Sequence, residues 1–158
     1  MPSGLDVIDR KIMRELVRDA RISQVVLAER VGLSPTACGR RLQQLEKAGV
    51  IRGYSADIDA GSLGYRMHVI VNITLDRQSE NALGAFEKAI SRCPDVVSCY
   101  LMSGSDDYLV QVQARDMEDY ERIHSQHLSR LPGVARLQSS FAMRNVIKRG
   151  ISAAALAG

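Results

Sequence analysis

Long apolar runs and a secretory leader are both absent from this chain. None of its 158 residues lies in an apolar stretch of the roughly 18 residues that a membrane-spanning helix needs. The first residues, MPSGLDVIDRK, lack the basic-then-apolar order of a signal peptide. We therefore expect a cytoplasmic protein of one or two small globular domains.

Signatures of catalysis and of bound cofactors are also missing. The sequence has no G-x-S-x-G, P-loop or Rossmann fingerprint, and its three cysteines match no zinc or disulfide spacing. His124 and His127 are three residues apart, but no acidic or cysteine companion stands at ligand spacing beside them. We expect no enzyme, no metal and no cofactor, and we expect the thiols to be reduced and buried.

Positive charge is concentrated in the first third of the sequence. Up to residue 54 there are ten lysines and arginines against six acidic residues, whereas the remainder has eleven basic and twelve acidic residues. A basic segment joined to a nearly neutral body indicates a polyanionic partner for the first part only.

The same first third has the pattern of three helices. Apolar residues at helical spacing predict an amphipathic helix near the N-terminus, with Asp6 placed to cap its start. Ser23 is the next N-cap candidate, before a short helix that Gly32 ends, where a left-handed turn favours glycine. A third helix is predicted from Pro35 to about residue 48.

Two short helices joined by a glycine turn form a helix-turn-helix, whose second helix enters the major groove of DNA. The exposed start of that helix has hydroxyl, arginine and amide side chains suited to phosphates and base edges. Residues 50–58 are predicted to follow as a short wing. Such three-helix domains also serve as dimerisation or protein-binding modules, which stays an alternative. The predicted DNA contacts are Ser34, Thr36, Ala37, Arg40, Arg41 and Gln44 in the helix and Arg52 in the wing.

A change from helical to alternating periodicity marks a second domain after a polar, glycine-bearing linker. The pattern predicts strands from about 65 to 75, at 96–102, at 108–114 and within 134–146, and helices at 80–92 and from 117 to about 131. This β-α-β-β-α-β order is typical of a ferredoxin-like fold. Helices cover one face of such a sheet, so the other face is expected to form a two-fold homodimer.

We therefore predict an α+β chain of two domains. A winged helix-turn-helix occupies 1–56, a linker 57–64, a ferredoxin-like effector-binding and oligomerisation domain 65–148, and a tail 149–158. The small, apolar tail is expected to be either disordered or a strand that packs on a neighbour.

Spaced motifs in this order resemble the Lrp/AsnC family, the leucine-responsive and feast/famine regulators. They are LDxxDxxI from Leu5, DARIS from Asp19, LAxxVGLSPT from Leu27 and RxxxLxxxGVIxxY from Arg41. In the second domain LMSGSDDYLV, from Leu101, resembles the family's effector loop, and LPGV matches a further signature. Gly39 departs from the larger side chain common at its position, which bears on the preferred DNA sequence.

The resemblance implies double-stranded DNA as a partner, contacted through Ser34, Thr36, Arg40, Arg41 and Gln44. It also implies a small effector, usually an amino acid, bound at subunit interfaces of dimers that often assemble into octamers.

The loop after Leu101 is the expected effector site. Gly104 permits a positive φ and leaves backbone N–H groups open to a carboxylate, and Asp107, with Asp106 beside it, can pair with an α-ammonium group. Ser105-Asp106 stands where the family commonly has an acidic and an aromatic residue, which bears on the side chain accepted. A plain β-turn with a solvated Asp-Asp tip is the alternative. The predicted effector residues are Leu101, Met102, Ser103, Gly104, Asp106, Asp107 and Tyr108, with Met117, Ser140, Phe141 and Ala142 implied by the resemblance.

Three functional hypotheses remain open on the sequence. The first is an effector-responsive, sequence-specific transcriptional regulator. The second is an architectural DNA-binding protein without a metabolite signal. The third is a small enzyme or amino-acid-binding module whose N-terminal helices only mediate assembly.

Overall fold

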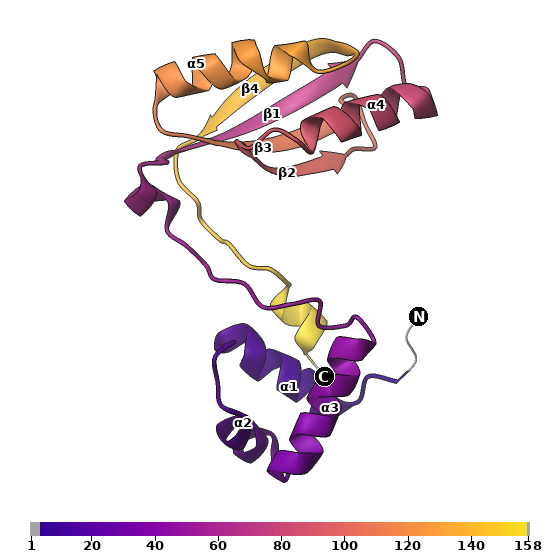
Figure 1. Cartoon of the computed structure of the whole chain (residues 1–158), viewed down its shortest axis with the longest axis vertical. Coiled ribbons are helices and arrows are strands. Elements are labelled where there is room, and N and C mark those ends of the chain that lie inside the picture. The colour runs from indigo at the N-terminus through magenta and orange to yellow at the C-terminus, as the bar shows by residue number, and fades with distance from the viewer. Residues whose placement is uncertain (1–3, 158) are drawn as a thin grey trace. The chain divides into compact units, whose positions relative to one another are not determined.

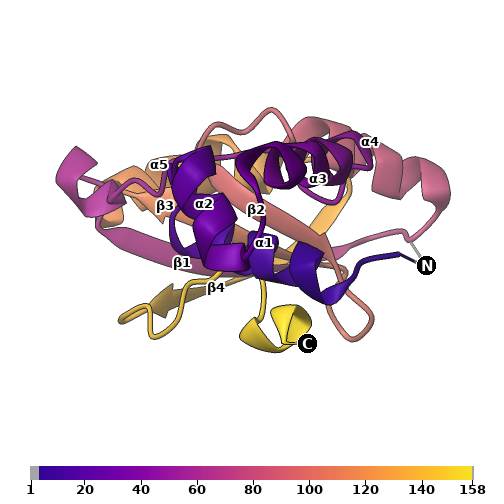
Figure 2. The same cartoon turned by 90° about the horizontal axis from the view of Figure 1, so that it is seen from below.

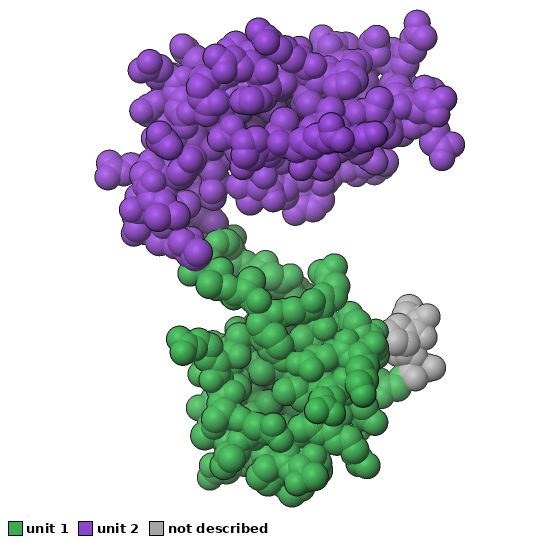
Figure 3. Space-filling view, in the orientation of Figure 1, with its two compact units in different colours: residues 1–57, 147–158 green, residues 58–146 purple. Residues whose placement is uncertain are grey.

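The computed structural model describes residues 4–157, which form two compact units. Unit 1 comprises residues up to 57 together with those from 147 onward, and unit 2 comprises residues 58–146 (Figure 3). The chain therefore leaves unit 1 once and returns to it at its C-terminal end.

Unit 1 contains three helices, α1 (Val7–Arg18), α2 (Gln24–Val31) and α3 (Pro35–Lys47), seen from below in Figure 2. Each begins at a predicted cap, because Asp6, Ser23 and Ser34 accept hydrogen bonds from backbone N–H groups in the first turn. Gly32 ends α2 with a φ of 78°, a left-handed conformation that favours glycine. The tight turn between α2 and α3 is that of a helix-turn-helix.

The core of unit 1 lies between the three helices. Glu15 of α1 adds a polar link at its edge, because its carboxylate accepts hydrogen bonds from Arg18 at 2.9 Å and from Arg30 of α2 at 2.8 Å. These arginines hold the pKa of Glu15 below its usual value, with the Arg30 hydrogen bond the larger cause. The buried core residues are Ile12, Leu27, Ala28, Val31, Cys38 and Leu45.

The segment expected to form a wing has no strand. Residues 50–59 contain neither helix nor strand, although Val50 and Ile51 pack against the helical core. These two side chains extend the core of α1–α3, and Arg52 after them is exposed.

The C-terminal tail packs on unit 1. Residues 153–156 form a short 3-10 helix beside α1, drawn in yellow in Figures 1 and 2. Leu156 is 6% exposed, Arg10 of α1 donates a hydrogen bond to the Ala155 carbonyl at 3.0 Å, and Lys148 pairs with Asp57 at 2.6 Å. The described tail residues, 149–157, are thus a part of the helical unit and contain no strand.

Leu156→Ala is expected to destabilise unit 1 by about 2 kcal/mol, because it removes a buried side chain at the edge of the core. Hydrogen exchange of the α1 amides should accelerate, since the tail covers that helix. Ile151→Ala is the matched control, because Ile151 is 43% exposed. Equal exchange rates in the two variants would contradict the assignment of the tail to this core.

Unit 2 is a four-stranded antiparallel sheet in the order β2-β3-β1-β4. Its strands are β1 (Met67–Leu75), β2 (Val96–Leu101), β3 (Tyr108–Ala114) and β4 (Val134–Ala142). The helices α4 (Glu80–Ile90) and α5 (Met117–Gln126) lie on one face of the sheet (Figure 1). A 3-10 helix, Ala60–Leu63, stands within the predicted linker. The order β1-α4-β2-β3-α5-β4 is the predicted ferredoxin-like arrangement.

The two faces of this sheet differ in character. Toward the helices, β1 and β3 present buried residues in strict alternation, which is the predicted one-sided pattern. Away from them, the register places Ile70 beside Ser140, and Asn72 between Leu109 and Gln138. Within unit 2 no helix covers this second face. No helix in the described part of the chain is long and apolar enough to cross a membrane.

Candidate functional site

The first turns of α3 form an exposed polar surface. Ser34 accepts a hydrogen bond from the Ala37 N–H at 3.2 Å, and Pro35 occupies the first helical position, so the start of the helix is fixed. Thr36, Arg40 and Gln44 follow with exposed side chains. Within residues 4–157, Arg40 forms no ion pair, so its guanidinium is available to a polyanion.

Arg41, in contrast, points into unit 1. Its guanidinium donates hydrogen bonds to Asp6 at 2.7 Å and to Asp9 at 2.9 Å, and Asp9 is 8% exposed. The backbone N–H of Asp9 and the guanidinium of Arg41 hold the pKa of Asp6 below its usual value. The charge of Arg41 therefore joins α3 to the capped start of α1, and the DNA contact expected for Arg41 stays a prediction.

Tyr54 ties the extended segment back to α3. Its hydroxyl donates a hydrogen bond at 2.8 Å to Glu46, which lies in the last turn of α3. Burial, together with this carboxylate, raises the pKa of Tyr54 to about 12. The segment that has Arg52 is therefore anchored on both sides, by Ile51 in the core and by Tyr54.

In unit 2, both carboxylate oxygens of Asp107 accept hydrogen bonds from other residues of the same unit. Its side chain is held within the unit, accepting from the buried backbone N–H of Leu75 at 2.7 Å and from Gln78 at 2.8 Å. The residue is 8% exposed. It thereby fixes the end of β1 and the turn toward α4, and its pairing with an effector's ammonium group stays a prediction.

The neighbouring loop residues are similarly engaged. Asp106 pairs with Arg136 at 3.0 Å and accepts a hydrogen bond from Thr74 at 3.3 Å. Tyr108 is 1% exposed, stacks on Phe86 and belongs to the core, so its side chain does not face the loop's open surface. Gly104 does not adopt a positive φ, so the expected backbone conformation is absent there. The loop residues left exposed are Leu101, Met102, Ser103, Gly104 and Ser105.

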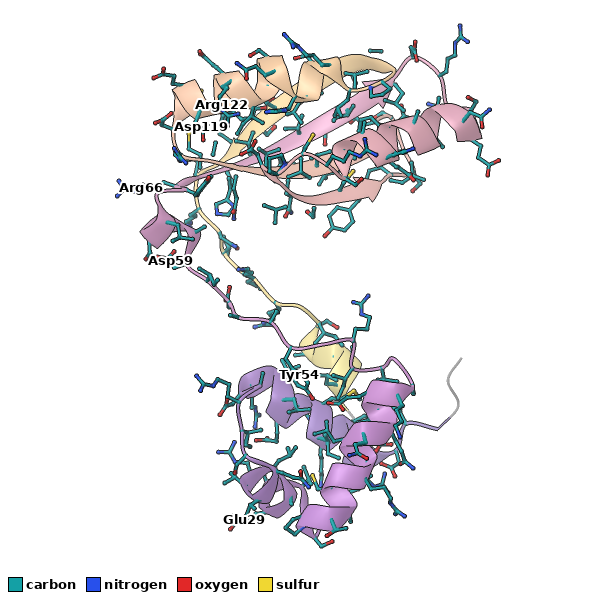
Figure 4. All side chains as sticks on the ribbon, in the orientation of Figure 1. Glu29, Tyr54, Asp59, Arg66, Asp119 and Arg122 are labelled. Atoms are coloured by element: carbon teal, nitrogen blue, oxygen red, sulfur yellow. The ribbon has the colours of Figure 1, made fainter. Side chains whose placement is uncertain are left out.

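Two other predicted effector residues line an open hollow of about 640 Å³ between α5 and β4. Met117 and Phe141 are half exposed there, and Tyr120 packs edge-on against Phe141 with its hydroxyl bonded to Ser139. Arg122 closes one side, next to Asp119 at 2.8 Å (Figure 4). The hollow combines aromatic and charged groups. Ser140 and Ala142 also follow along β4 but face the opposite side of the sheet.

The predicted effector residues thus form two groups at opposite ends of β1. The register pairs Phe141 of the hollow with Val69, and Tyr108 beside the loop with Ile73, four residues farther along. At about 3.3 Å per residue these two positions are roughly 13 Å apart along β1, which is longer than an amino acid. One chain cannot place both groups around the same small ligand.

Comparison with known protein families accounts for both units. The family model described as the Lrp/AsnC ligand binding domain matches residues 68–151, and the model described as a winged helix-turn-helix DNA-binding domain matches residues 5–52. The chain belongs to the Lrp/AsnC family of transcriptional regulators. Family membership and the fold class inferred from sequence are therefore confirmed, and the chain is a regulator and not an enzyme.

Individual relatives cover nearly the same length. An uncharacterised helix-turn-helix regulator of Sinorhizobium fredii is 50% identical over 74% of this chain and 92% of its own. The leucine-responsive regulatory protein of Escherichia coli is 40% identical over 90% of this chain and 87% of its own. A transcriptional regulator of Neisseria meningitidis, solved as a complex with L-methionine, is 33% identical with a TM-score of 0.88, covering 93% and 95% of the two chains.

The sequence did not predict which residues form hydrogen bonds and ion pairs with the expected site residues. Gln78, Thr74 and Arg136, which hold the Asp106-Asp107 pair, stand about 30 positions away from it in sequence. Tyr120 and Ser139, at the hollow beside Phe141, were also missed. A polar residue at the end of a buried strand was the only signal available for Thr74.

Proposed function

We propose that the protein regulates transcription by inserting the start of α3 into the major groove of target DNA, in response to an amino acid bound between copies of unit 2. The exposed row of Thr36, Arg40 and Gln44 on a capped helix is the observation that supports DNA reading most directly. A regulator of this kind works where the chromosome is, so we place it in the cytoplasm.

The amino-acid effector is inferred from relatives and from the separation of the predicted residues. The Neisseria relative is a complex with L-methionine and the Escherichia relative is named leucine-responsive. Because the loop group and the Met117–Phe141 group are too far apart within one chain, two copies would have to join to surround one ligand. We therefore place the effector at an interface between subunits, as expected from sequence.

The uncovered sheet face supports a homodimer as the first step of assembly, with an octamer as the larger form. Ile70 and Leu109 lie on this face among amide side chains, so a second copy could pack on it with two-fold symmetry. Binding of an effector would then shift the equilibrium between assemblies that space their α3 helices differently.

A thermal-shift screen with the twenty amino acids at millimolar concentration tests the proposal. A ligand that binds only the native state must raise its melting temperature, so one or a few amino acids should give a selective rise. Salt titration of DNA binding is the parallel measurement, since phosphate contacts make affinity fall steeply with salt. Salt-sensitive DNA binding without any amino-acid shift would favour the architectural alternative instead.

A further inference from the structure

Gly39 stands in the middle of α3, where glycine costs about 1 kcal/mol relative to alanine. Its backbone does not explain the choice, because its φ is not positive. A Cβ built at this position would lie 2.3 Å from Nε2 and 3.0 Å from Cδ of Gln24, far inside normal contact distance. The space that a side chain at position 39 would use is therefore filled by the amide end of Gln24.

Gln24 is the first residue of α2 and is exposed. Its Nε2 donates a hydrogen bond to the carbonyl oxygen of Pro35, the first residue of α3, at 2.8 Å. This bond holds the amide against the start of the recognition helix. The second N–H of Nε2 and the Oε1 acceptor have no other partner among the hydrogen bonds of residues 4–157.

The amide lies on a flank of α3 that is open to solvent. Thr36 and Gln43, three positions before and four positions after Gly39, are its neighbours along the helix surface, and both are exposed. In a helix-turn-helix the helix before the recognition helix crosses the DNA backbone, so its N-terminus comes close to the groove edge. Gln24 stands at that N-terminus.

We propose that the Gln24 carboxamide replaces the missing side chain of residue 39 as the DNA-contacting group on this flank of α3. This inference rests on the proposed role of α3 in DNA binding. A carboxamide presents a donor beside an acceptor, which suits an adenine edge, and its N–H group alone suits a phosphate oxygen. The bond to Pro35 orients the group before DNA arrives, so Gly39 and Gln24 act together.

A double-mutant cycle tests this pairing. Gln24→Ala removes the amide, and Gly39→Ala forces the same amide out of its place, because the two groups cannot share the space. The target is the duplex that wild-type protein enriches from a randomised library. Each single variant should bind this duplex about tenfold more weakly than wild-type protein does. The double variant should lose no more than either single variant, because both changes remove one contact.

Two readouts define the contact. The library selection is repeated with Gln24→Ala. If the amide reads a base edge, the preference at one base-pair position should relax. If the amide binds a phosphate, the preferred sequence should stay unchanged and affinity should fall equally for all sequences. The salt slope should stay unchanged in either case, because a neutral amide releases no counterion. Melting curves of the full-length variants check that they are folded.

Wild-type affinity in both single variants would overturn the inference. Gln24 would then only join α2 to α3 through its hydrogen bond to Pro35. Additive losses in the double variant would also overturn it, since the two residues would then act separately. Arg40→Ala distinguishes this failure from failure of the proposed function. If Arg40→Ala loses affinity while Gln24→Ala does not, only the Gln24 inference falls; if neither loses affinity, both fall.

Discussion

Asp107→Ala is expected to destabilise unit 2 by about 3 kcal/mol, which lowers its melting temperature by roughly 15 °C. The substitution leaves the buried N–H of Leu75 and the amide of Gln78 without their acceptor. A buried donor without a partner costs its full desolvation penalty, and water cannot easily replace the carboxylate at a residue that is 8% exposed. Thermal unfolding followed by circular dichroism measures the loss.

Two matched variants separate this structural role from effector binding. Asp106→Ala removes a carboxylate whose partner Arg136 is 61% exposed, so it should cost well under 1 kcal/mol. Asp107→Asn keeps an oxygen for the Leu75 N–H and should be folded, with any amino-acid-induced melting shift preserved. A folded Asp107→Asn protein that has lost this shift, at wild-type stability, would restore Asp107 as an effector contact.

The elements of the fold were predictable because periodicity records burial along a short stretch of sequence. The alternation from about Tyr65 to Leu75 predicted β1 to within two residues. Ser23 and Gly32 predicted the two ends of α2, and Ser34 predicted where α3 begins. Caps and alternating strands depend on neighbours within a few positions, which the sequence displays directly.

The roles of individual charged residues were not predictable in the same way. Arg41 and Asp107 are polar residues at positions typical of binding surfaces, but their partners lie about 30 positions away. The tail shows the same limit over a longer span, since Leu156 packs near α1 at the other end of the chain. Local patterns indicate that a side chain is polar; only the tertiary fold decides whether it faces solvent or a buried partner.

Substitutions of Arg40 and Arg41, two neighbouring arginines of α3, are expected to have opposite effects on DNA binding and stability. Arg40→Ala should weaken DNA binding by about tenfold to a hundredfold, because the exposed guanidinium of Arg40 is the one that can reach phosphates or a guanine edge. Unit 1 should melt at the wild-type temperature, since Arg40 makes no ion pair within the described chain. Binding titrations at several salt concentrations measure both the affinity and the number of phosphates neutralised.

Arg41→Ala should show the reverse pattern. The substitution removes the only cation that bonds the carboxylates of Asp6 and Asp9 within residues 4–157, so unit 1 should melt roughly 5 °C lower. DNA affinity, measured well below that melting temperature, should change less than threefold. Arg41→Lys is the control, because a lysine keeps the charge but cannot donate to two carboxylates in a planar fork. If Arg41→Ala lowers DNA affinity as strongly as Arg40→Ala at unchanged melting temperature, the guanidinium must leave Asp6 and Asp9 to reach DNA. The capped start of α1 would then be coupled to DNA binding, because the same two carboxylates would lose their partner in every complex.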